Sequence, residues 1–62
     1  MRFVLSFDMD NDAFAGDPGT EAADILDRLA KNVRDTYLDE GDGGNLLDVN
    51  GNTVGHWSVE SN

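Results

Sequence analysis

The chain has 62 residues, a formal net charge of -9 and no cysteine. A chain of this length forms one domain, and it buries only about 60% of the surface that its unfolded form exposes, so we expect marginal stability. The absence of cysteine excludes disulfides and thiolate metal sites and favours a cytoplasmic location. Without a long apolar stretch or a polybasic segment, we expect neither a membrane nor nucleic acid as a direct partner.

The first predicted element is a strand over residues 2–9. Apolar side chains at Phe3, Leu5, Phe7 and Met9 alternate with Val4, Ser6 and Asp8. This period of two is typical of a half-buried strand. The acidic and glycine-containing segment 8–16 then predicts a loop, anchored by Phe14.

The second predicted element is a helix over residues 18–40. Asp17 is the expected N-cap, with Thr20 as the alternative, and Pro18 suits the first helical position. Gly41 is the expected stop. An apolar stripe with helical spacing runs along the segment: Ala22, Ile25, Leu26, Leu29, Val33 and Tyr37. Such a helix would be about 35 Å long, enough to overhang a small sheet.

The polar face of this helix carries acids four residues before bases. Asp24 precedes Arg28, and Asp27 precedes Lys31, in the order that favours ion pairing along a helix. We interpret this face as a solvated one.

A β-hairpin over 45–49 and 53–60 is the third prediction, because Asn50-Gly51 between two strand-like runs is a strong turn signal. A two-residue turn would place Leu47 opposite Val54. A three-residue turn with a left-handed Gly51 would align four apolar residues on one face: Leu47, Val49, Trp57 and Val59. The three-residue turn assembles the larger apolar surface and is favoured, although a shift of the strand register by one residue would exchange the two faces.

These elements predict an α+β fold, a single β-α-β-β domain over residues 1–62 with a three-stranded sheet and one long helix packed on one face. The order 1-3-2 makes every neighbouring pair antiparallel. The alternative places strand 1 beside strand 2 through a right-handed crossover. Either order leaves a second sheet face without a helix, and Val4, Leu46 and Val54 without obvious cover.

The most chemical-looking stretch contains Asp8, Asp10 and Asp12, which alternate like the first ligands of an EF-hand loop. Ala13 and Gly19 stand where that loop needs Gly and Glu, so the choice is between a weak cation site and a solvated turn. His56 is the only histidine, and no catalytic constellation surrounds it or any serine. We therefore predict no enzyme activity and no cofactor.

The end of the predicted helix departs from local rules. Asp39 and Glu40 would lie at the negative end of the helix dipole, and Leu38 would point away from the apolar stripe. Together with Asp42 in the following loop, and with Val4 and Val54 on the sheet, these residues are the candidates for partner binding. A frayed last helical turn is the alternative interpretation.

Two patterns span most of the chain. The first is Phe3-x-Leu5-x-Phe7-x-x-Asp10-Asn11-x-Ala13-Phe14, and the second is Leu46-x-Asp48-x-Asn50-Gly51-Asn52-x-Val54-Gly55-x-Trp57. With the intervening helix, they resemble a group of uncharacterised small acidic proteins from actinobacterial phages, prophages and plasmids. The resemblance implies a phage or mobile-element origin and a non-catalytic role, and it carries no ligand residues across. Members of that group often have more basic residues in the helix than the three found here.

Three functions follow as hypotheses. The leading one is a protein that binds another protein, either a second copy of itself or a host or phage protein, through the uncovered sheet face, a sheet edge or the helix end. The second is an acidic DNA mimic that inhibits a nucleic-acid-binding protein through carboxylates outside the helix: Asp8, Asp10, Asp12, Asp42, Asp48 and Glu60. The third is a weak divalent-cation module.

Overall fold

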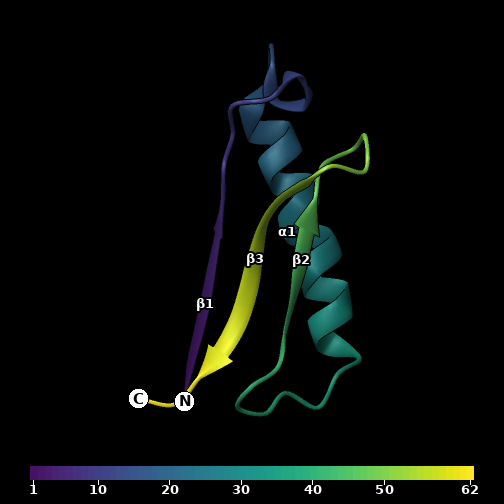
Figure 1. The fold of residues 1–62 in the computed structure, drawn as a ribbon. Helices are drawn as coiled ribbons and strands as arrows, with labels where there is room; N and C mark the ends of the chain where they lie inside the picture. Colours follow the sequence, from purple (N-terminus) through teal and green to yellow (C-terminus); the bar gives the residue numbers. More distant parts are fainter.

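The computed structural model describes all 62 residues (Figure 1). The elements are β1 (Arg2–Phe7), a short 3-10 turn η1 (Asp12–Phe14), α1 (Pro18–Arg34), β2 (Gly43–Leu47) and β3 (Thr53–Glu60). The three strands form one sheet of order β1-β3-β2, and both neighbouring pairs are antiparallel. The predicted α+β fold is thus confirmed, with order 1-3-2 of the two that the sequence allowed.

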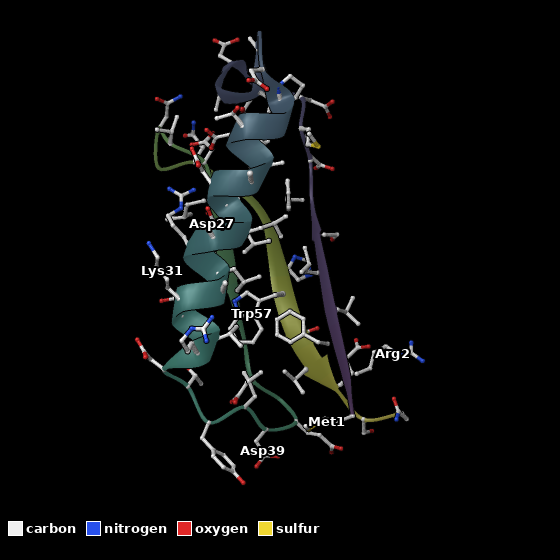
Figure 2. The ribbon with its side chains drawn as sticks, turned by 180° about the vertical axis from the view of Figure 1, so that it is seen from behind. Met1, Arg2, Asp27, Lys31, Asp39 and Trp57 are labelled. Atoms are coloured by element: carbon white, nitrogen blue, oxygen red, sulfur yellow. The ribbon has the colours of Figure 1, made fainter.

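The strand register determines which side chains face α1. Leu5 and Gly44 both lie opposite Trp57, and Leu46 lies opposite Gly55, so these positions share one face of the sheet. The main core cluster lies on this face and consists of four buried residues, with Phe7 and Trp57 among those packed around it: Phe14, Ile25, Leu29 and Leu46. Val59 is buried as well, outside this cluster. Figure 2 shows Trp57 between α1 and the sheet.

The hairpin turn is partly as predicted. Gly51 has φ +83°, the left-handed conformation expected of the longer turn. However, the pairing shifts at a β-bulge between Leu46 and Leu47, and β2 covers 43–47 instead of 45–49. The bulge turns Leu46 toward the helix and leaves Leu47 and Val49 exposed, so the prediction that these two share a face with Trp57 is wrong.

The predicted helix begins correctly and ends too late. Asp17 caps α1, since its carboxylate accepts from the Thr20 N–H at 3.1 Å and from the Thr20 hydroxyl at 2.7 Å. The helix ends at Arg34 instead of residue 40. Tyr37, the last residue of the expected stripe, is 95% exposed. A helix of 17 residues already spans about 25 Å, close to the length of β3, and a longer one would find no sheet to pack on.

The first loop is anchored as expected. β1 ends at Phe7, two residues earlier than predicted, although the Asp8 N–H still donates to the Val54 carbonyl at 2.9 Å. Phe14 is buried, and its ring stacks near that of Phe7 with 6.2 Å between centroids. These contacts tie the loop to the end of α1 nearest the hairpin turn (Figure 1).

The face of the sheet opposite α1 is mostly polar. It carries the positions that alternate with the core residues, among them Ser6, His56 and Asn45, which share a row across the three strands. The sequence left Val4, Leu46 and Val54 without cover, but two of them are covered. Leu46 is buried in the core, and Val54 is half-buried against it. The β-bulge accounts for the burial of Leu46. The structure contains no helix that could span a membrane.

Candidate functional site

The most elaborate polar arrangement surrounds Asp48, which is only 2% exposed. Its Oδ2 accepts from Asn11 Nδ2 at 2.6 Å and from Asn52 Nδ2 at 3.3 Å. Its Oδ1 accepts from the backbone N–H groups of Asn50 and Asn52, both at 2.9 Å. Four donors occupy the acceptor positions of one carboxylate, so Asp48 has none left for a metal ion or a substrate proton.

Burial and hydrogen bonding act in opposite directions on this carboxyl. Burial alone would raise the pKa of Asp48, but the hydrogen bonds from Asn52, Asn11 and Asn50 favour the ionised form, and the net result is a pKa below the ordinary value. Asp48 is therefore a charged structural anchor for the hairpin turn at neutral pH.

Two side chains of α1 hold the same end of the hairpin. Glu21, buried in the first helical turn, accepts from the Val49 N–H at 3.0 Å. Arg28, which the sequence paired with Asp24, donates from Nη2 to the Leu47 carbonyl at 2.6 Å. These contacts occupy backbone groups at and just beyond the end of β2, which is an edge strand of the sheet.

A groove of about 350 Å³ lies between α1 and the hairpin. Its lining includes the polar residues Arg28 and Asn32 and the apolar residues Leu46 and Trp57. The charged residues of the groove, Arg28 and Asp48, are both engaged with the hairpin. The groove therefore brings together no nucleophile and base.

The residues assigned to the helix end lie in the loop between α1 and β2. The Asp42 carboxylate accepts from the Asp39 N–H at 2.9 Å, and Asp39 Oδ1 accepts from the Glu40 N–H at 2.8 Å. The prediction that Asp39 and Glu40 lie at the negative end of the helix dipole is wrong, because the helix ends at Arg34. Leu38 is half-buried and lines a small pocket of about 170 Å³ with Phe3.

The remaining candidates do not form one site with this loop. Val4 lies on the polar face of β1 and is partly exposed, whereas Val54 packs toward the core. The structure has no group of three acidic or histidine side chains placed to hold a metal ion, so it does not bring Asp8, Asp10 and Asp12 together. Asp48, which the sequence offered as a possible phosphate mimic, is buried, so its carboxylate is not accessible to a partner.

The other edge of the sheet is different. Because the Asp8 N–H donates to Val54, alternation along an antiparallel pair points the N–H and C=O groups of Phe3, Leu5 and Phe7 away from β3. The side chains of Phe3 and Leu5 are 40% and 37% exposed on the face that α1 covers elsewhere. We call these outward backbone groups, together with the exposed side chains of Phe3 and Leu5, the β1 edge.

Figure 1 shows α1 behind β2 and β3, with β1 standing beside the helix and not beneath it. The view from behind in Figure 2 agrees, since α1 lies over β2 and leaves β1 uncovered. The Phe3 ring stacks parallel to that of Trp57 with 5.3 Å between ring centroids, yet the Phe3 side chain stays 40% exposed. β1 is thus the edge strand whose apolar side chains α1 leaves exposed, whereas Arg28 of α1 reaches the end of β2.

Comparison with protein-family models, curated proteins and solved structures finds no match. The site therefore has to be interpreted from its own geometry. The sequence placed Phe3 and Leu5 on an apolar face but did not predict their exposure, which depends on where a helix shorter than expected lies. The Asp48 cluster was also missed, although Asp-x-Asn-Gly-Asn is a pattern in which the first side chain can bond to the turn that follows.

Proposed function

We propose that this protein is a small non-catalytic binding protein, of the phage or mobile-element type that its sequence resembles, and that it acts by protein–protein contact through the β1 edge. The single observation that carries the proposal is the contrast between the two edges of the sheet. Arg28 and Glu21 hold backbone groups at the end of β2. The outward groups of Gly43 and Asn45 are unpaired, but neither residue has an apolar side chain. On β1 the outward groups are unpaired and lie beside the exposed side chains of Phe3 and Leu5.

An open edge strand offers a row of backbone donors and acceptors to another strand. Most natural edges carry charges, proline or bulges that discourage such pairing, but β1 has none of these between Phe3 and Phe7. In a chain with 13 acidic residues, none falls within residues 1–7. The charge distribution therefore leaves this strand open to a partner and keeps the rest of the surface soluble.

The test compares two leucines that are exposed to a similar degree on opposite edges. Leu5→Lys places a charge on the β1 edge, and Leu47→Lys places the same charge at the end of β2. Proteins captured by the wild-type chain and by Leu47→Lys should be lost by Leu5→Lys, with thermal melts establishing that both variants fold. Equal capture by all three chains would rule out the β1 edge as the binding surface.

A further inference from the structure

We infer that the occupant of the β1 edge is the β1 strand of a second copy of this chain, paired antiparallel about a two-fold axis at Leu5. This inference rests on the proposed function and names its partner. The result is one continuous six-stranded sheet of order β2-β3-β1-β1-β3-β2, with both α1 helices on the same face.

The register follows from the groups that face outward. Placing Leu5 opposite the partner's Leu5 makes Phe3 lie opposite Phe7, and each of these pairs uses outward N–H and C=O groups on both strands. The same register puts Arg2 opposite Asp8 of the other copy, twice by symmetry. Arg2 is the only base outside the helix, and Asp8 is the acid that directly follows β1.

Other registers satisfy fewer groups. Pairing that keeps the outward groups facing each other can shift only in steps of two residues. One such step moves Arg2 opposite Ser6 and leaves Phe7 without a partner in β1. The opposite step moves Arg2 opposite Asp10, which is also an acid, but it leaves Phe3 without a partner in β1. Strand length therefore selects the register centred on Leu5, and charge complementarity excludes only the first of the two alternatives.

The side chains beside the edge supply apolar area. A stable interface of standard size takes about 800 Å² from each partner, roughly a fifth of the 4338 Å² surface of this chain. Strand pairing has to be accompanied by side-chain packing to reach that area. Phe3 and Leu5 face the helix side, where the two-fold axis brings the pairs from both copies into one row.

The flank of α1 adds to the same surface. Residues two apart on a helix lie about 200° apart around its axis, so Leu26 lies on the side opposite Arg28. Because Arg28 reaches β2, Leu26 lies on the flank nearer β1, and it is exposed. In the paired sheet this leucine borders the row of Phe3 and Leu5 side chains.

The first experiment uses the absence of native cysteine. In the inferred dimer only position 5 of β1 lies opposite itself, with about 5.5 Å between Cα atoms, which suits a disulfide. Under mild oxidation Leu5→Cys should form a covalent dimer, and the matched variant Leu47→Cys should form no intermolecular disulfide. Equal cross-linking of both variants would show random collision and would overturn the inference.

The second experiment tests the register by sedimentation equilibrium. Arg2→Asp and Asp8→Arg should each raise the dimer dissociation constant roughly three- to tenfold, and the double variant with both changes should restore it. Asp10→Arg changes the charge equally outside the register and should not weaken the dimer. Equal dimer dissociation constants for the wild type and all four variants would overturn the register.

Failure of the dimer can be separated from failure of the proposed function. A wild-type chain that stays monomeric up to millimolar concentration overturns the second copy as partner. Amide exchange of that monomer then decides the rest. Fast exchange at Phe3, Leu5 and Phe7, with slower exchange at Val4 and Ser6, keeps an open edge available to a different protein, whereas slow exchange at all five positions removes the edge itself.

Discussion

Asn11 donates from Nδ2 to Asp48 Oδ2 at 2.6 Å, across 37 positions of sequence. The same asparagine accepts from the Ala13 N–H through Oδ1 at 3.0 Å and so caps η1. One side chain therefore joins the loop that follows β1 to the turn between β2 and β3. Because Phe14 in that loop belongs to the core, the bond also positions a core residue relative to the hairpin.

Replacing Asn11 should therefore destabilise the protein more than its surface position indicates. We expect Asn11→Ala to lower the free energy of unfolding by about 1–2 kcal/mol, because it removes a hydrogen bond to a carboxylate and the cap of η1. Asn45→Ala, at an exposed strand position on the polar face, is the control and should change stability by less than about 0.5 kcal/mol. Urea denaturation measures both. Equal effects would contradict a special role for Asn11.

Stability should fall in acid through Asp48 and Asp17. The hydrogen bonds that each accepts lower the pKa of both carboxyls in the folded chain below the ordinary value of 3.8. A lowered folded pKa contributes stability that is present above the unfolded value and is lost as pH falls through the folded value. In thermal melts, Asp48→Asn should be less stable than wild type at neutral pH, and the difference should shrink below about pH 4.

Asp24→Asn, on the exposed face of α1, controls for the loss of one negative charge. A constant difference between wild type and Asp48→Asn from neutral pH down to pH 2 would contradict the assignment of a folded-state carboxylate.

Gly55 is required by the close approach of β1 to β3. A Cβ at this position would collide with the Ser6 carbonyl oxygen and lie 2.6 Å from Phe7 Cα. We expect Gly55→Ala to cost about 2 kcal/mol or more, because backbone atoms cannot move aside as a flexible side chain can. Gly19→Ala is the control: its Cβ meets only Asp17 Oδ1 at 3.6 Å, and it should stabilise α1 by about 0.5 kcal/mol. Tolerance of Gly55→Ala in denaturant melts would contradict the observed pairing.

Sequence periodicity predicted the fold correctly because local patterns determine local structure. Residues adjacent in the sequence determine three of the predicted features: the alternation of Phe3, Leu5 and Phe7, the helix cap at Asp17 and the turn at Gly51. The bulge at Leu46 and the end of α1 at Arg34 are not determined in this way, because each depends on the length and packing of another element. The exposure of the β1 edge has the same origin, since it follows from where α1 lies across the sheet.

Added salt should strengthen the inferred dimer. Each copy carries a net charge of -9, so the two repel each other at long range, and salt screens this repulsion. The two Arg2–Asp8 contacts weaken under the same conditions, but they are few and partly exposed. We expect the dissociation constant to fall as sodium chloride rises from low to physiological concentration. A rise measured by sedimentation equilibrium would show that the ion pairs dominate association.

Arg28 should decide whether association stops at two copies. Its bond to the Leu47 carbonyl occupies the end of the second sheet edge, and Arg28→Ala should cost about 1 kcal/mol of stability while freeing that carbonyl. A sheet with two open edges can add copies without closing, so the variant should form species larger than a dimer in light scattering. Lys31→Ala, three residues further along the charged face of α1, also removes one positive charge and should remain a dimer. If both variants stop at the dimer, Arg28 does not protect the β2 edge, and the contrast between the two edges loses its cause.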